Sequence, residues 1–173
     1  MDVRTLCLGI LTLGDASGYE IRKQFEEGPL AYFYGAGFGA IYPALKSLNR
    51  DGMVEYTRIT QKGHPPKNIY SITPKGLELF RESLAASPAP DMIRSQTIMM
   101  FFFNQFMEEE HLDKVYDEYM ERSHQTIEKI RNSDLQVAKS GCKFTSGLGL
   151  AIYEAIIQYM EDNRSILFNR FEE

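Results

Sequence analysis

Three side chains that can contact an anion recur at four-residue steps between positions 42 and 50: the phenol of Tyr42, the ammonium of Lys46 and the guanidinium of Arg50. Side chains four residues apart lie on the same face of a helix. The opposite face of this segment would carry the apolar residues Ile41, Ala44, Leu45 and Leu48. The polar face has no carboxylate, which favours contact with a polyanion.

Proline and glycine place the tip of this helix at residues 39–43. Pro43 lacks a backbone N–H, so we expect it in the first turn. In helix-turn-helix proteins the N-terminal end of the second helix points into the major groove of DNA. An amphipathic surface helix without a partner is the alternative. Under the first interpretation the DNA-contacting residues are Gly39, Ala40, Tyr42, Pro43, Lys46 and Arg50.

A basic loop follows this helix. Residues 53–60 and 69–72 are rich in β-branched and aromatic side chains and are separated by a segment with glycine and two prolines, which is typical of a β-hairpin with a longer loop. Lys62 and Lys67 stand on either side of the two prolines. We expect both lysines to contact DNA phosphates rather than bases.

The neighbouring segments predict the other helices of a winged helix-turn-helix domain. Residues 3–13 are mostly apolar and predict a buried first helix. Ser17 and Glu20 have the spacing of a capping box at the start of a second helix, which should run to about residue 27. The third helix spans about 39–51. Thr73, followed by proline, predicts the N-cap of a fourth helix.

The remainder of the chain predicts long helices. Residues 87–90, Ser-Pro-Ala-Pro, are the clearest linker. Beyond them, 91–107, 110–135 and 147–171 carry apolar residues at three- and four-residue steps. The predicted fold is therefore mainly α with a small β-hairpin. It comprises a winged-helix DNA-binding domain over 1–86, the linker, and a helical dimerisation region over 91–173.

These C-terminal helices carry more apolar surface than an appendage of this size can easily bury alone. The simplest partner is an identical chain, and a homodimer with two-fold symmetry follows. The dimer contacts are expected from Phe102, Phe106, Tyr116, Ile152, Ile156 and Tyr159. A cavity among these helices would be the natural place for an effector, since a shift there changes the separation of the two DNA-binding heads.

Charge is distributed unevenly along the chain. The formal net charge is −5, but residues 1–85 hold ten Lys/Arg against nine Asp/Glu, whereas residues 86–173 hold nine against fifteen. Within 34–75, six cationic residues face two acidic ones. A local basic patch matters more than global charge for phosphate contact, so the acidic total does not exclude DNA.

Signals for an enzyme, a metal site or a membrane protein are weak. Cys7 and Cys142 have no second ligand at metal spacing, and neither a metal nor a cofactor is expected. The Gly-Leu-Gly at 147–149 lacks a preceding strand and a third glycine, so it predicts the start of a helix rather than a phosphate loop. Glutamates 108–110 predict a solvated helix start rather than an acid/base pair. No apolar run reaches the roughly 18 residues of a membrane span, and a cytoplasmic location is expected.

Together, the motifs resemble the PadR family of transcriptional regulators. The resemblance rests on Gly39-x-Ile-Tyr-Pro-x-Leu45, on Asp51-Gly-Met-Val54, on Lys67-x-x-Tyr-x-Ile-Thr73 and on Ser17-Gly-Tyr-Glu-Ile21. It implies a winged-helix domain that binds double-stranded DNA, a C-terminal dimerisation region, and repression relieved by a small molecule or a stress signal. Many members have a polar residue where this chain has Ala40, a position suited mainly to a thymine methyl. A winged helix used only for protein contact is the alternative function.

Overall fold

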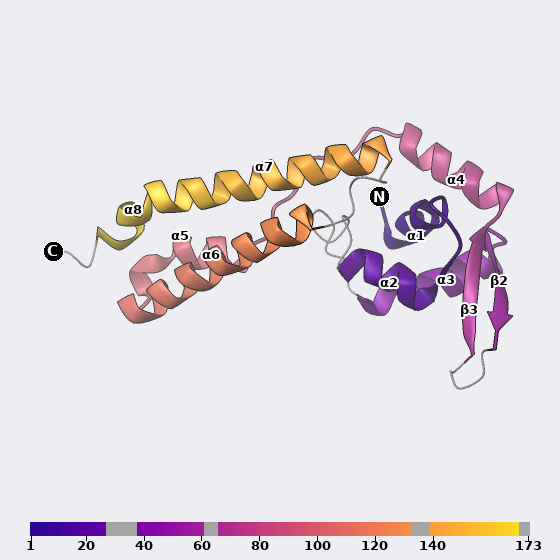
Figure 1. Cartoon of the computed structure of the whole chain (residues 1–173), viewed down its shortest axis with the longest axis horizontal. Helices are drawn as coiled ribbons and strands as arrows, with labels where there is room; N and C mark the ends of the chain where they lie inside the picture. The colour runs from indigo at the N-terminus through magenta and orange to yellow at the C-terminus, as the bar shows by residue number, and fades with distance from the viewer. Residues whose placement is uncertain (27–37, 61–65, 133–138, 170–173) are drawn as a thin grey trace. The chain divides into compact units, whose positions relative to one another are not determined.

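The computed structural model describes residues 1–26, 38–60, 66–132 and 139–169, and the chain divides into two compact units, Met1–Pro90 and Asp91–Glu173. Figure 1 shows the elements of both. The first unit contains four α-helices, one short 3-10 helix and three strands within the described ranges. The second unit consists of helices there. Each unit has its own cluster of buried apolar residues.

Three of the four described α-helices of the first unit begin at a capping side chain, and the third along the chain does not. The helices are α1 (Val3–Leu11), α2 (Gly18–Glu26), α3 (Ile41–Arg50), which follows the 3-10 helix η2 (Phe38–Ala40), and α4 (Pro74–Ala85). Asp2 accepts a hydrogen bond from the Thr5 backbone N–H at the start of α1, and Thr73 accepts one from Gly76 at the start of α4. Each cap satisfies a backbone donor that has no partner within its helix.

The capping box at the start of α2 is confirmed. The Ser17 backbone N–H donates to Glu20 Oε2 at 2.7 Å, and the Glu20 N–H donates to Ser17 Oγ at 3.2 Å. These hydrogen bonds lower the pKa of Glu20, because they favour the ionised carboxylate. The first turn of α2 is therefore fixed by two reciprocal bonds.

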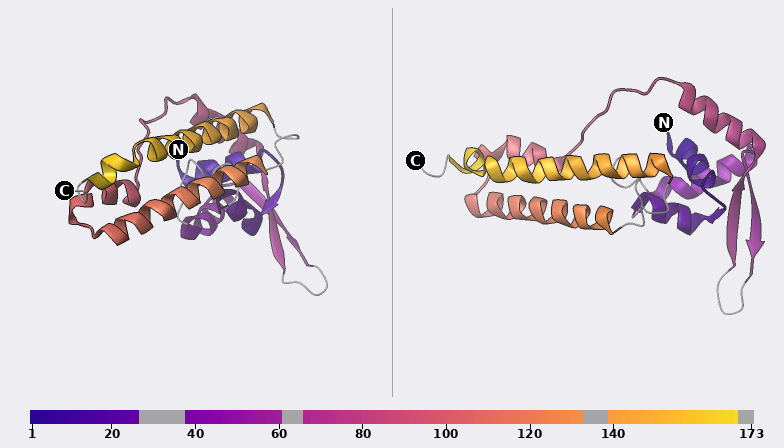
Figure 2. Two further views of the ribbon diagram at one scale, coloured as in Figure 1. Left: turned by 60° about the vertical axis from the view of Figure 1, so that its left-hand side comes forward. Right: turned by 45° about the horizontal axis from the view of Figure 1, so that its top comes forward.

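The sheet has three antiparallel strands in the order β1-β3-β2: β1 (Ala16–Ser17), β2 (Val54–Ile59) and β3 (Lys67–Ile72). Tyr56 pairs with Tyr70 in the hairpin, and Ser17 pairs with Ile69 in β1. The sequence predicted the hairpin, which is confirmed, but it missed β1. Two residues are too few to show an alternating pattern. Figure 2 shows the hairpin extending beyond the helices of its own unit.

A single core joins α1, α2, α3 and β2. Leu8, Ile21, Ile41, Leu45 and Leu48 are completely buried in it. The start of α4 packs closely against the backbone at Met53. A Cβ at Gly76 would lie only 2.0 Å from the Met53 carbonyl oxygen. Glycine is therefore required by space at this crossing.

The second unit is built on two long helices, α6 (Glu109–Arg131) and α7 (Ser140–Asp162). Its shorter helices are α5 (Gln96–Phe102), the 3-10 helix η3 (Asn104–Phe106) and α8 (Arg164–Phe168). Figure 2 shows α6 and α7 running side by side. Arg131 pairs with Glu154 across them at 2.9 Å. As predicted, the glutamates at 108–110 lie exposed at the start of α6.

One predicted helix start was wrong. The Gly-Leu-Gly at 147–149 lies inside α7, which begins at Ser140, two turns earlier. Glycine costs a helix about 1 kcal/mol relative to alanine, but tertiary packing outweighs such propensities. The predicted helix over 147–171 also breaks at Asn163, so that α8 is separate. None of the helices within the described ranges is long and apolar enough to cross a membrane.

Candidate nucleic-acid interface

Helix α3 has the two-sided character that the sequence predicted. Its buried side chains are Ile41, Ala44, Leu45 and Leu48. The opposite face exposes Tyr42, Pro43, Lys46 and Arg50, and Tyr42 retains 51% of its accessible surface. A hollow of about 480 Å³ lies along this face, lined by Pro43, Lys46, Ser47, Asn49 and Arg50. The structure thus gathers the predicted helix residues on one solvent-facing surface.

The two cations of this face differ in their surroundings. No carboxylate of the described ranges pairs with Lys46, whose ammonium is open to a ligand. Arg50 is 75% exposed, yet its Nε donates to Asp51 Oδ1 at 3.1 Å and its terminal nitrogen donates to Ser47 Oγ at 3.2 Å. Lys46 is therefore the stronger candidate for a direct DNA contact.

Asp51 ties the end of α3 to the first helix. Its carboxylate accepts from Arg50 and, at 2.7 Å, from Arg4 of α1. The hydrogen bonds from Arg50 and Arg4 hold the pKa of Asp51 below its ordinary value. The Asp51 carboxylate therefore stays ionised, and the two arginines of the protein balance its negative charge.

At the tip of α3, Gly39 and Ala40 are exposed in η2. Ala40 is the N-cap residue of α3, and within the described structure no side chain caps this end. The partial positive charge of the α3 N-terminus therefore lies on the same surface as Lys46.

The wing contributes exposed cations from β2 and β3. Lys67 begins β3 with 44% of its side chain exposed, and its Nζ lies 4.0 Å from Glu20 Oε1. Arg58 is exposed on β2 and pairs in register with Asn68. Sequence reasoning counted Arg58 in the basic patch but did not assign it a contact. Lys62 lies outside the described residues.

Sequence reasoning also missed the contribution of α2. Tyr19 is 65% exposed on this helix. A hydrogen bond with Glu26 raises the pKa of Arg22, and the phenols of Tyr42 and Tyr19 act on it in the same direction with smaller effects. The ring of Tyr42 on α3 also lies against the start of α2, since a Cβ at Gly18 would lie 2.8 Å from Tyr42 Cε1. Residue spacing within one helix cannot reveal this contact, because it joins α2 to α3.

The predicted dimerisation residues have different environments. Phe102 is 72% exposed, Phe106 80%, Ile152 42% and Tyr159 66%. Tyr116 differs, since it is only 5% exposed and its hydroxyl donates to the Met160 carbonyl at 2.8 Å. Its ring packs within its own chain and offers little surface to a second one.

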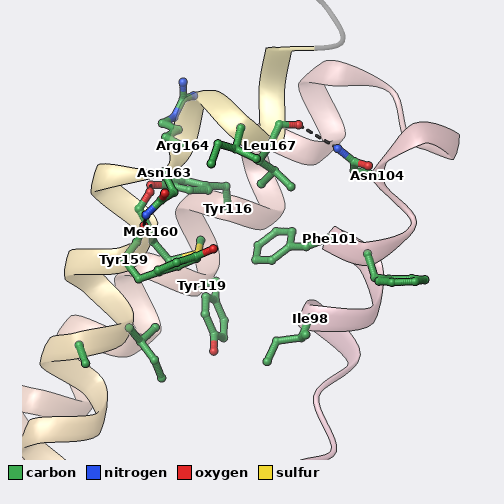
Figure 3. A pocket seen from close by; sticks show the side chains of 14 residues that line it. Ile98, Phe101, Asn104, Tyr116, Tyr119, Tyr159, Met160, Asn163, Arg164 and Leu167 are labelled. Atoms are coloured by element: carbon green, nitrogen blue, oxygen red, sulfur yellow. Dashed lines mark hydrogen bonds between the residues drawn. The ribbon is translucent and has the colours of Figure 1, made fainter.

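Four of these residues nevertheless meet at one groove of about 690 Å³. It lies between α5, α6, α7 and α8 and is lined in part by Phe102, Tyr116, Ile156 and Tyr159 (Figure 3). Asn104 donates to the Leu167 carbonyl at 2.9 Å at one end. Burial raises the pKa of the lining residue Tyr119. The groove is predominantly aromatic and aliphatic.

The surroundings of Cys7 do not favour a reactive thiol. Cys7 is completely buried, and burial raises the pKa of its thiol to about 12, so the thiol stays protonated. Within the described ranges no three His, Cys, Asp or Glu side chains are grouped so as to hold a metal ion.

Comparison with known proteins assigns the family. Residues 7–82, which contain the helix-turn-helix and the wing, match the model of the transcriptional regulator PadR-like family. Residues 7–82 therefore form a PadR-like domain. The chain is 24% identical over 127 residues to the negative transcriptional regulator PadR of Bacillus subtilis, an alignment covering 73% of this chain and 69% of that protein. The family comprises transcriptional regulators and not enzymes, as the sequence predicted.

Solved structures extend the likeness to the C-terminal unit. The smu.1604c protein from Streptococcus mutans superposes with a TM-score of 0.86 at 29% identity, covering 95% of this chain and 99% of that one. For the PadR-like transcriptional regulator BC1756 from Bacillus cereus the TM-score is 0.84 at 26% identity, over 95% and 94%. B. subtilis PadR, solved with operator DNA, shares the fold with a TM-score of 0.77 at 19% identity over 95% and 98%. It has also been solved with p-coumaric acid.

Proposed function

We propose that this PadR-like regulator binds specific DNA sequences by inserting the exposed face of α3 into the major groove. The observation that carries the proposal is the division of α3 into a fully packed face and a face with Tyr42, Lys46 and Arg50. The packed face fixes the helix on the core. The other face presents groups that can bind bases and phosphates.

The wing would supply sequence-independent affinity. Lys67 and Arg58 are exposed on the hairpin, and Lys62 is predicted to join them. Cations on such a loop contact phosphate oxygens, which position a protein on the duplex without selecting a sequence. B. subtilis PadR, which has the same fold, has been solved bound to operator DNA. That complex supports DNA as the partner here.

A second copy of the chain is the proposed partner of the C-terminal unit. Phe144, Leu148, Ile152 and Tyr159 follow one another along α7 at intervals of four, four and seven residues and are all exposed. Such spacing forms one apolar stripe on a helix. Large exposed apolar patches mark interaction sites in soluble proteins. A two-fold pairing would cover the stripe and the adjoining groove in both copies.

Repression released by a small molecule completes the proposal. The B. subtilis relative is a negative regulator by name and has been solved with p-coumaric acid. A ligand that binds against the C-terminal helices would favour one arrangement of the two copies, and a change in DNA affinity follows by linkage. The test is to titrate p-coumaric acid into the DNA complex and to measure release of the duplex.

DNA binding itself is tested by fluorescence anisotropy with a labelled duplex from the promoter of the protein's own gene and a shuffled duplex of equal composition. Lys46→Ala should lose about 1–3 kcal/mol of binding free energy on the promoter duplex. Arg81→Ala is the matched control, because Arg81 is an exposed cation on α4 that pairs with Glu78. Equal losses in both variants would mean that general charge, not α3, determines binding.

The alternative is a winged helix that contacts only proteins. Phosphate contacts release counterions, so DNA affinity should fall linearly with salt on logarithmic axes. A protein-contact module would retain little DNA even at low salt. Absence of retention by the wild-type chain would therefore select the alternative.

A further inference from the structure

Gly18, the first residue of α2, lies against the ring of Tyr42 on α3. Gly18 is buried. A Cβ built at Gly18 would lie 2.8 Å from Cε1 and 3.3 Å from Cδ1 of Tyr42, closer than the roughly 3.5–4.0 Å of favourable carbon contacts. The edge of the phenol ring therefore occupies the space that any other side chain at position 18 would need.

The need for glycine at this position is one of space. The described glycines with a positive φ are Gly14 and Gly52, and Gly18 is not among them. Its backbone conformation is thus accessible to alanine. A methyl group would be excluded only by the neighbouring ring.

The backbones on both sides of the contact are fixed. Ser17, immediately before Gly18, pairs with Ile69 of β3 and closes the capping box with Glu20. On the other side, Ile41 and Leu45 are completely buried and anchor the first turns of α3. Neither helix can easily withdraw from the other.

The ring, in contrast, can move. Tyr42 is about half exposed, so rotation about its side-chain bonds could carry the ring into solvent without opening the core. A methyl group at position 18 would consequently turn the phenol away from its present direction and leave the helices in place. Leu45 would lie at an ordinary 3.5 Å from the added methyl and would not need to move.

We propose that Gly18 is a positioning residue for DNA recognition, because its missing side chain lets the Tyr42 ring lie on α2 with its phenol held at a set direction on the exposed face of α3. This inference rests on the proposed role of α3 as the recognition helix. It assigns part of the sequence selectivity to a glycine that itself touches no DNA. The surface against which the Tyr42 ring packs belongs to α2, the helix that precedes α3 in the helix-turn-helix.

The test is a double-mutant cycle with Gly18→Ala, Tyr42→Ala and the double variant of the full chain. Affinity for the promoter and shuffled duplexes is measured by anisotropy, and the unfolding midpoint is measured without DNA. We expect Gly18→Ala to lower promoter affinity about tenfold or more, a loss of about 1.4 kcal/mol. It should leave shuffled-duplex affinity and the unfolding midpoint nearly unchanged. In the Tyr42→Ala background, Gly18→Ala should cause no further loss.

An NMR measurement follows the ring directly. The ring resonances of Tyr42, identified by their absence in Tyr42→Ala, should shift in Gly18→Ala while those of Tyr56 and Tyr70 in the wing stay in place. An equal loss of affinity in both backgrounds would overturn the proposal, since the effect would not pass through Tyr42. Unfolding of Gly18→Ala would overturn it too, because glycine would then serve the fold.

Failure of the proposed function would look different. Unchanged promoter affinity in Tyr42→Ala would remove Tyr42 from DNA recognition and would end this inference with it. In that case the ring shift in Gly18→Ala would still establish the contact between α2 and α3. A ring that does not shift, with Tyr42→Ala still impaired in DNA binding, would refute the positioning role alone.

Discussion

Truncation of Ile152 on α7 tests the proposed dimer most sharply. Complete burial of an isoleucine side chain stabilises by about 1.5–3 kcal/mol. Ile152 retains 42% of its surface in the single chain, so covering the remainder contributes about 0.6–1.3 kcal/mol per copy. In a two-fold dimer both copies carry the substitution, so the loss of dimerisation free energy is about 1.3–2.5 kcal/mol. Ile152→Ala should therefore raise the dimer dissociation constant roughly 8- to 70-fold.

Sedimentation equilibrium over a concentration series measures this constant. Leu13→Ala is the control, because Leu13 is an exposed aliphatic residue of the first unit, 57% accessible, that lies outside the α7 stripe. A mixed dimer of wild-type and variant chains should lose half the free energy, a change of about 3- to 8-fold. A dissociation constant that is the same for Ile152→Ala and wild type would refute the α7 interface. An equal rise of the dissociation constant in Ile152→Ala and Leu13→Ala would also refute it.

The remaining predictions concern the wing, the fold and pH. Lys62→Ala combined with Lys67→Ala should lower affinity similarly for promoter and shuffled DNA and flatten the logarithmic salt slope by at most about two units; a loss confined to one sequence would contradict phosphate contact. Gly76→Ala should destabilise the first unit by about 1–3 kcal/mol or more in urea unfolding, since its Cβ would meet the Met53 carbonyl, whereas Gly39→Ala, which meets nothing within 4 Å, should not. Asp51 has a lowered pKa when folded, so its stabilising effect is present above the ordinary value of 3.8 and is lost as pH falls through the folded pKa. The stability difference between wild type and Asp51→Asn should accordingly shrink on acidification below that value, and a constant difference would show that the ionised carboxylate contributes nothing.

Local patterns made α3 and its neighbours predictable. The four-residue spacing of Tyr42, Lys46 and Arg50 reports a helix face directly, because the helical period is a local property of the backbone. The Ser17–Glu20 box is equally local, and its hydrogen bonds form between residues three apart. Periodicity therefore identified the surface that the structure exposes.

Contacts between distant segments could not be predicted in this way. Strand β1 exists because Ala16 and Ser17 meet β3 more than fifty residues later. The packing of Gly18 against Tyr42 likewise joins two helices. Among the described residues no side chain caps the start of α7 at Ser140, so the local sequence does not mark where this helix begins. In each case the local structure depends on a contact with a distant segment, and the local sequence does not identify that segment.

The uneven charge of the chain bears on how DNA would approach it. Residues 91–173 hold nine cationic and fifteen acidic side chains, so the second unit repels a duplex, whereas residues 34–75 carry an excess of four positive charges. Salt screens charges beyond about 8–10 Å, which leaves the local patch around α3 and the wing to determine phosphate contact. Few cations are available there, and Arg50 is already partly engaged by Asp51 and Ser47. If the chain binds DNA as proposed, nonspecific affinity should be modest. We then expect discrimination between duplexes to depend on Tyr42 and Lys46, and on the space that Gly18 leaves for the Tyr42 ring.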